Sequence, residues 1–347
     1  MKSRIALLVS LSILVLSACS SPLSVVKRVI TKEEPTNVLT GLPGINGPVL
    51  AVKIDDTPQA HPQVGIEKAD VVYIEQVEGG LTRLAAIFSQ YPQSLPEKVG
   101  PVRSARISDI EILAQYGRVG FAFSGAQSKL YPVINSANLV NLSADREPPT
   151  IYSRDPARFA PTDMLLDPAK LVEKAINAEG AKIDSAKSVG WKFGSISLDK
   201  DSLVAKKAVA IDEADISWPA SSYQVKWSAQ EKAWLLSYRH SPNVLANGEQ
   251  IQMRSFIIQL VSITDSEFSD KFGGVTPLSH TVGQGAGYLL RDGYALPITW
   301  NRTDQTSGTS WSFVDGSEAI FAPSQIWVAL TDKAPKFTES APPASTK

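Results

Sequence analysis

Arginines and carboxylates lie close together in two short stretches of the sequence, residues 78–83 and 100–109. Arginine binds phosphate and carboxylate groups through paired N–H donors. The second stretch leads into a predicted helix that Ser104 can cap, which places Arg103 just before the helix and Arg106 in its first turn. Cations there oppose the helix dipole, so an anion is expected to offset them. The candidate ligand-binding residues of the two stretches are Arg83, Arg103, Arg106, Glu78 and Asp109.

Two interpretations of this pattern stay open. In the first, the arginines and the free N–H groups at the helix start hold a bound phosphate or carboxylate. In the second, acidic side chains of the protein itself neutralise the arginines, and the available partners are Asp109, Glu111 and Glu78. The first interpretation predicts a binding site, and the second predicts a structural cluster of ion pairs.

Three further carboxylates belong to predicted strands. Asp55 and Asp56 follow the apolar run 49–54, and Glu75 lies in the strand-like segment 71–77. Ligands usually gather at the carboxyl ends of strands in open α/β sheets, so these side chains could form an acid/base pair or hold a hard cation. Asp-Asp-Thr-Pro is also ordinary turn sequence, because Asx side chains bond to the backbone that follows. All three residues are therefore candidate ligand-binding residues, and no catalytic residue is assigned.

Composition excludes several classes of chemistry. One cysteine and three scattered histidines rule out a disulfide framework and leave no metal site to predict, and no motif identifies a cofactor. With 34 basic and 35 acidic side chains the net charge is −1, so no nucleic-acid partner is expected. Neither a G-x-S-x-G elbow nor an H-E-x-x-H pair is present, which disfavours hydrolases of those types.

The elements that position these residues predict an α+β protein, with a mixed α/β N-terminal domain followed by a β-rich C-terminal domain. In the first half, a Gly79-Gly80 turn joins two predicted strands, a helix is expected over 105–116, and a short helix over 127–131 should end at Pro132. Asp167 and Pro168 are typical of a helix start. The predicted organisation is a signal peptide (1–18), a flexible tether (19–40), a mixed α/β domain (41–181), an irregular connection (182–217), a β-rich domain (218–333) and a disordered tail (334–347).

The second half differs in composition, because all seven tryptophans follow residue 190. At strand positions tryptophans usually fill a core, although a sugar-stacking platform is the alternative. The glycine-rich segment 283–287 lacks the G-x-G-x-x-G spacing and no helix pattern follows it. It is interpreted as a turn or bulge and not as a nucleotide-binding loop.

The N-terminal sequence predicts that the protein is located outside the cytoplasm. Lys2 and Arg4 precede the apolar run 5–16, which is too short for the roughly 20 residues of a membrane-spanning helix and ends in Leu-Ser-Ala-Cys19. This ending is similar to a bacterial lipobox, which predicts lipidation at Cys19 and a membrane-anchored chain on the extracytoplasmic face. The alternative is an ordinary secretory signal in which the cysteine is incidental.

Several of these stretches together resemble the YerB-like bacterial lipoprotein family, whose members have no established function. The residues that carry the resemblance are 52–56, 62–63, 69–73, 77–83 and 100–106, followed by Gly283, Gly285, Gly287, Gly293, Trp300 and the 326–327 strand. The resemblance implies an extracytoplasmic lipoprotein with a mixed N-terminal domain and a β-rich C-terminal domain. It does not supply a reaction.

Two function classes follow. The first is a module that binds an anionic envelope ligand, such as a glycan or a lipid-linked molecule, and it requires Arg83, Arg103 and Arg106 to converge. The second is an envelope phosphotransferase or hydrolase, which also requires a carboxylate base beside those arginines.

Overall fold

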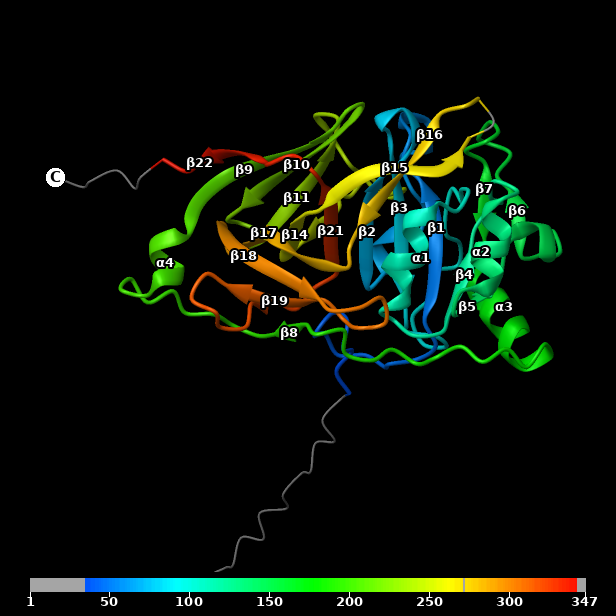
Figure 1. Ribbon diagram of the computed structural model, residues 1–347, viewed down its shortest axis with the longest axis horizontal. Helices are drawn as coiled ribbons and strands as arrows, with labels where there is room; N and C mark the ends of the chain where they lie inside the picture. The colour runs from blue at the N-terminus through cyan, green and yellow to red at the C-terminus, as the bar shows by residue number, and fades with distance from the viewer. Residues whose placement is uncertain (1–34, 271, 342–347) are drawn as a thin grey trace, which may run out of the picture. The chain divides into compact units, whose positions relative to one another are not determined.

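The computed structural model describes residues 35–270 and 272–341 (Figure 1). The first part of the chain forms strands that are apolar and almost entirely buried, as the sequence predicts for 49–54, 71–77 and 81–88. β1 pairs antiparallel with β3, which pairs antiparallel with β2, while β1 and β4 run parallel. These strands are β1 (Leu50–Asp55), β2 (Val71–Gln76), β3 (Thr82–Phe88), β4 (Val119–Ala122), β5 (Leu139–Asn141) and the hairpin β6 (Tyr152–Arg154) and β7 (Met164–Leu166).

The second part of the chain is rich in β-strands. Most of them are antiparallel neighbours, and the long pair β17 and β18 is in continuous register over nine residues. The strands are β8 (Lys192–Phe193), β9 (Val209–Trp218), β10 (Ser221–Ser228), β11 (Ala233–Tyr238), β12 (Ser241–Pro242), β13 (Gln252–Met253), β14 (Ser255–Leu260), β15 (Ser262–Ser269), β16 (Val275–His280), β17 (Gly283–Arg291), β18 (Tyr294–Arg302), β19 (Ser310–Phe313), β20 (Ile320–Phe321), β21 (Ile326–Thr331) and β22 (Lys336–Glu339). The predicted α+β class with a β-rich C-terminal part is confirmed.

One large sheet runs through both parts of the chain. Its order is β12-β11-β10-β9-β18-β17-β14-β21-β2-β3-β1-β4-β5. β21 is parallel to β14 on one side and to β2 on the other, so it connects the two predicted domains within a single sheet. Figure 1 shows β21 beside β2 near the centre of the fold.

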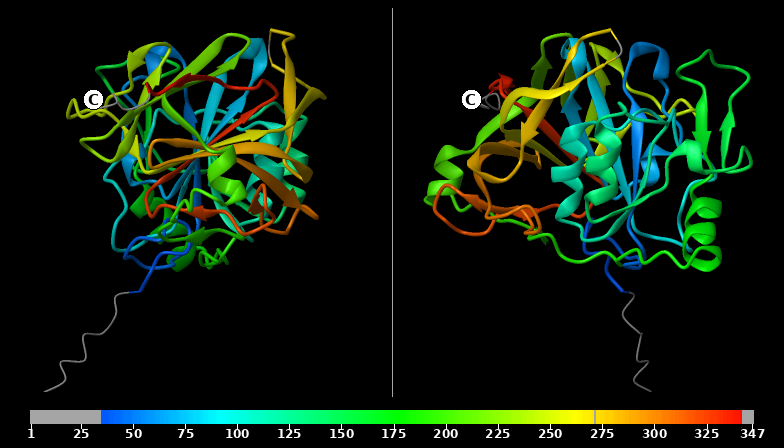
Figure 2. Two further views of the ribbon diagram at one scale, coloured as in Figure 1. Left: turned by 90° about the vertical axis from the view of Figure 1, so that its left-hand side faces the viewer. Right: turned by 45° about the vertical axis from the view of Figure 1, so that its right-hand side comes forward.

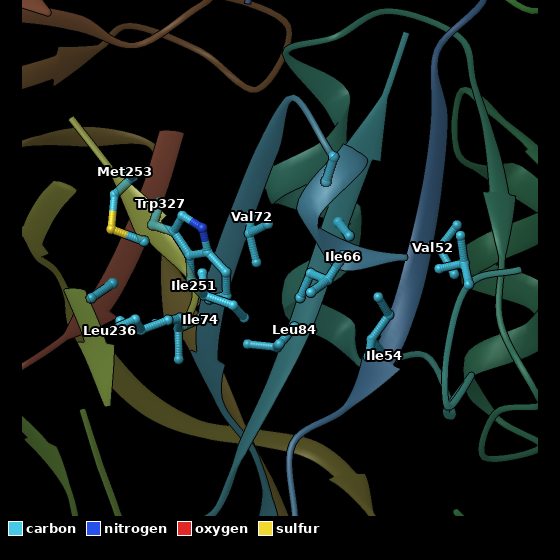
Figure 3. Close-up of a cluster of buried hydrophobic side chains, with 14 of the residues drawn as sticks. Val52, Ile54, Ile66, Val72, Ile74, Leu84, Leu236, Ile251, Met253 and Trp327 are labelled. Atoms are coloured by element: carbon cyan, nitrogen blue, oxygen red, sulfur yellow. The ribbon is translucent and has the colours of Figure 1, made fainter. Parts of the chain in front are cut away.

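Alternating side chains of the sheet form two hydrophobic clusters, one on each face. On one face Val52, Ile74 and Leu84 pack with Trp327 and Leu236 (Figure 3). The other face packs against the helix α1 (Ile107–Ala114). Six of the seven tryptophans are buried, which agrees with the core interpretation of these residues.

Local capping residues determine where the helices begin. Asp167 accepts a hydrogen bond from the Lys170 N–H at 3.0 Å and caps α3 (Pro168–Glu173), as predicted. Residue Arg106, and not Ser104, is the N-cap of α1, and Asp109 Oδ2 accepts its backbone N–H at 2.7 Å. The remaining α-helices are α2 (Leu130–Ser136) and α4 (Leu203–Lys207). Pro132 does not end the short helix as predicted, because it lies in the first turn of α2, where no N–H is needed.

Three other expectations are corrected. Residues 35–40, expected in the tether, are folded, and Asn37 is buried and donates to Ser89 Oγ at 2.9 Å. The glycine-rich segment 283–287 lies inside the strand β17, paired with β14 and β18. The predicted irregular connection contains β8, α4 and most of β9.

The predicted disordered tail also contains structure. β22 pairs with β9, and the ring of Phe337 packs against Tyr288 at a centroid distance of 5.0 Å. The prediction of disorder was wrong for residues 336–339 because it considered only how few apolar residues the segment has. It could not take into account that the edge of β9 offers backbone hydrogen-bond partners to this segment. The signal peptide, Cys19 and residues 20–34 lie outside the described residues. Within the described ranges, no helix has the length and apolar character required to cross a bilayer.

Candidate functional site

Charged side chains line up where β1, β2 and β3 meet the start of α1. Asp55 and Glu75 both stand opposite Arg83 in the strand register, one on each side of it. Lys53 lies two residues before Asp55 and therefore on the same face of the sheet. The N-terminal turn of α1 adds Asp109 above this row.

Lys53 is the centre of a fully buried ion cluster. Its ammonium group contacts Glu75 Oε1 and lies 2.7 Å from Asp109 Oδ1, and all three side chains are inaccessible to solvent. Burial lowers the pKa of Lys53 to about 8, although the charge and hydrogen bond of Asp109 oppose this shift. Two carboxylates thus share one cation, and because both carboxylates are buried, neither is free to take part in chemistry at the surface.

Asp55 is shared between two arginines. Its Oδ1 lies 3.4 Å from the Arg83 Nη1, and its Oδ2 lies 2.7 Å from the Arg103 Nε. Arg83 is only 5% exposed, and its Nε has no hydrogen-bond partner among the described residues. Burial lowers the pKa of Arg83, and the nearby charge of Arg103 acts in the same direction against the effect of Asp55. The Arg103 side chain is 26% exposed.

Arg106 has a carboxylate of its own. Its Nε and Nη2 lie 2.8 Å and 2.7 Å from the same oxygen, Glu78 Oε2, and Thr276 donates its hydroxyl to the other oxygen of Glu78. Burial raises the pKa of Glu78, but the hydrogen bond and charge of Arg106 outweigh it, so the net pKa is below the usual value. Gly79 and Gly80, both with positive φ, make the predicted tight turn that places Glu78 there.

Two adjoining cavities open beside these residues, and we call them together the arginine cleft. The larger, about 920 Å³, is lined by Arg83, Arg103 and Arg106, with Glu78 beside them. The smaller, about 680 Å³, is lined by Asp55 and Arg103. Both cavities share three lining residues, which are Thr57, Arg103 and Pro161.

Asp56 lies outside the cleft, in a buried hydrogen-bond network. Its carboxylate accepts the hydroxyl groups of Tyr223 at 2.6 Å and Thr82 at 2.5 Å, and His61 Nε2 lies 3.1 Å from it. The His61 ring stacks on Tyr238 at a centroid distance of 4.2 Å. This network connects the N-terminal segment to β10 and β11, which indicates a structural role for Asp56, whereas His61 also lines the smaller cavity.

The structure therefore sorts the candidates. Arg83, Arg103 and Arg106 line the larger cavity, and Asp55 lines the smaller one. Asp56, Glu75 and Asp109 line neither cavity. Within the described residues no three His, Cys, Asp or Glu side chains gather as a cation would require. Glu111, one of the expected partners of the arginines, instead accepts the Thr281 hydroxyl at 2.9 Å.

Sequence reasoning missed the residues that close the cleft. Phe268, Asp270 and Phe272 come from the β15–β16 hairpin, and Phe159 comes from the loop between β6 and β7. None of them lies near the arginines in sequence. The one local signal was an isolated phenylalanine in a loop rich in charged and proline residues, residues 154–163.

The fold and the site define a mixed α/β protein with a cleft of arginines and carboxylates beside its central sheet. The chain belongs to the family described as "Protein of unknown function (DUF3048)", whose N-terminal domain matches residues 39–182 and whose C-terminal domain matches residues 214–328.

Two comparisons agree with this assignment. The chain is 49% identical over 57 residues to "Putative lipoprotein YerB" of Bacillus subtilis (strain 168), a match that spans 16% of each protein. It shares the fold of the crystal structure of the YerB protein from Bacillus subtilis, with a TM-score of 0.71 and 20% identity over 88% of this chain and 100% of that one. The resemblance to the YerB-like family is thereby confirmed.

Proposed function

We propose that this protein is a lipoprotein anchored through Cys19 on the extracytoplasmic face of the membrane, and that its arginine cleft binds a ligand bearing phosphate or carboxylate. The anchor is supported by the Leu-Ser-Ala-Cys ending of the apolar run and by the name of its relative. The binding role is supported by the charges of the cleft.

The observation that carries the binding proposal is the sharing of Asp55 by two arginines. Among the described residues, Asp55 is the one carboxylate that pairs with either Arg83 or Arg103. Arg83 lines the larger cavity, and its buried Nε has no hydrogen-bond partner among the described residues. Buried donors without partners are costly unless a ligand or water satisfies them, so the cleft is suited to an anion.

Other charges in the cleft are already satisfied. Arg106 is held by Glu78, and Asp270 accepts the backbone N–H groups of Phe272 and Gly274 at 2.9 Å and 2.8 Å. We therefore assign the main ligand contact to Arg103, with Arg83 behind it and Arg106 as a fixed wall of the site.

An enzymatic role has weaker support. A phosphotransferase or hydrolase needs a carboxylate base at the cleft, and Asp55 is committed to two guanidinium groups. Glu75 and Asp109 are buried against Lys53 and do not line the cleft. The geometry favours binding over catalysis.

Titration with pyrophosphate by calorimetry tests the binding proposal. We expect binding to the purified chain, and a loss of about 10–100-fold in affinity for Arg103→Gln, because a charge-assisted hydrogen bond contributes about 1.5–3 kcal/mol. Arg118→Gln is the matched control, since Arg118 is exposed and lines neither cavity. Equal affinity in wild type and Arg103→Gln, or no binding at all, would reject the proposal.

The anchor has a separate test. In Cys19→Ala the protein should leave the membrane fraction, whereas Ser21→Ala should stay with it. Firm membrane association of Cys19→Ala would show that lipidation is not the anchor.

A further inference from the structure

We infer that the ligand of the arginine cleft is an anionic glycan, a chain of sugar rings whose acidic group binds at Arg103 while rings on either side stack on Phe159 and Phe272. This inference rests on the proposed anion site and adds the class of molecule that carries the anion.

The first support is the exposure of the two phenylalanines. Phe159 is 89% exposed and Phe272 is 84% exposed, whereas the next most exposed large apolar side chain in the described ranges is Val275 at 46%. Aromatic surface that stays exposed to water forgoes the stabilisation that burial would give. Two such rings beside one cleft indicate a contact surface.

The second support is their position relative to the charge. Phe159 lines only the smaller cavity and Phe272 only the larger one, and Arg103 lines both. The cleft therefore presents an aromatic ring, a guanidinium group and a second aromatic ring in that order. A ligand that uses all three must be extended, with its anionic group between two parts that have flat apolar faces.

Polar side chains between the rings favour sugars over acyl chains. A pyranose has C–H faces that pack on aromatic rings and a rim of hydroxyl groups that need hydrogen-bond partners. Hydroxyl and amide side chains that line the cleft include Thr57, Gln59, Ser104, Gln127, Ser128 and Ser269. An acyl chain would leave these groups without partners.

The position of the cleft in the fold also favours a ligand outside the bilayer. The β15–β16 hairpin and the loop between β6 and β7 lie at one end of the fold, and the described chain begins at the opposite end (Figures 1 and 2). A protein held through its N-terminus is held by the end away from this cleft.

Calorimetry with four probes tests the inference. The probes are trigalacturonate, its monomer galacturonate, the neutral trisaccharide maltotriose and dodecyl phosphate. We expect trigalacturonate to bind wild type about tenfold more tightly than galacturonate, because only the trisaccharide can contact both phenylalanine rings while one of its carboxylates binds at Arg103. The double variant Phe159→Ala/Phe272→Ala should lose this gain and keep its affinity for pyrophosphate. Leu42→Ala/Leu203→Ala, which removes two exposed apolar side chains outside the cleft, should behave as wild type.

The outcomes separate this inference from the proposed function. If pyrophosphate binds but trigalacturonate gains nothing over galacturonate, the glycan inference fails and the anion site stands. Equal binding of maltotriose would overturn the need for an anion. If dodecyl phosphate binds more tightly than pyrophosphate and this difference is lost in Phe159→Ala/Phe272→Ala, the ligand is a lipid phosphate and not a glycan. If pyrophosphate does not bind, both proposals fall.

Discussion

At the scale of single residues, Lys53 explains how the fold accommodates the buried carboxylates of Glu75 and Asp109. An uncompensated carboxylate in a dry interior costs several kcal/mol, and two adjacent ones also repel each other. The Lys53 ammonium lies between Glu75 and Asp109 and pairs with both. Lys53 and Glu75 lie on β1 and β2, the two strands that flank β3, so the cluster adjoins Asp55 and Arg83 on the same face of the sheet.

We expect Lys53→Met to lower the free energy of unfolding by about 3–5 kcal/mol, because it leaves two buried carboxylates without their cation. Lys53→Met/Glu75→Gln should recover part of this loss, since only one buried charge then remains. Urea denaturation of the three proteins measures both effects. A double variant no more stable than Lys53→Met would show that the loss has another origin.

The lowered pKa of Lys53 predicts the sign of a pH effect. In the folded protein the proton leaves near pH 8, whereas in the unfolded chain it leaves near pH 10.5. Between these values the unfolded chain binds more protons, so the contribution of Lys53 to the free energy of unfolding rises with pH. The difference in unfolding free energy between wild type and Lys53→Met should therefore increase from pH 8 to pH 10, and a decrease would contradict the assignment.

At the scale of elements, β22 shows how a short polar segment becomes ordered. It has few apolar residues, but β9 offers it a row of backbone partners and Tyr288 offers a surface for the one aromatic ring. An unpaired strand edge is a liability in a soluble protein, and β22 covers part of this one.

We expect Phe337→Ala to destabilise the protein by about 1–2 kcal/mol, since the ring is half-buried against Tyr288. Lys336→Ala, at an exposed position of the same strand, should change stability by less than about 0.5 kcal/mol. Urea denaturation of both variants checks this. Equal, negligible effects would indicate that β22 contributes nothing to stability.

At the scale of the whole molecule, β21 determines how the two family domains are joined. Its residue Trp327 is fully buried and stands between Phe256 of β14 and Val72 of β2. The network of Asp56 with Tyr223 and Tyr238 adds a second connection between the segments. Neither segment can lose its structure without exposing a central strand of the other.

We therefore expect a single unfolding transition. All seven tryptophans follow residue 190, so their fluorescence reports the C-terminal segment, while hydrogen exchange in β1 and β3 reports the N-terminal one. The two measurements in urea should give the same midpoint. Separate midpoints would show that the segments unfold independently and that the shared sheet is not cooperative.

The sequence by itself determined what depends on near neighbours in the chain. The apolar runs predicted β1, β2 and β3, the two glycines predicted the turn that places Glu78, and Asp167 predicted the start of α3. Hydrophobic periodicity, turn chemistry and helix capping are local properties, and each can be recognised in a window of a few residues. The sequence also predicted that Arg83, Arg103 and Arg106 could converge, because they lie in two short stretches rich in charged residues, and their role as a ligand site stays a prediction.

Only the tertiary structure determined which charged side chains form ion pairs with one another. Asp109 pairs with Lys53 and not with an arginine, and Asp55, not Glu111, holds Arg103. Phe159 and Phe272, which border the cleft, come from segments 56 and 169 residues beyond Arg103 in the sequence. Ion pairing and burial depend on distances of a few ångströms between residues far apart in the chain, and those distances are set when the strands of the sheet come together.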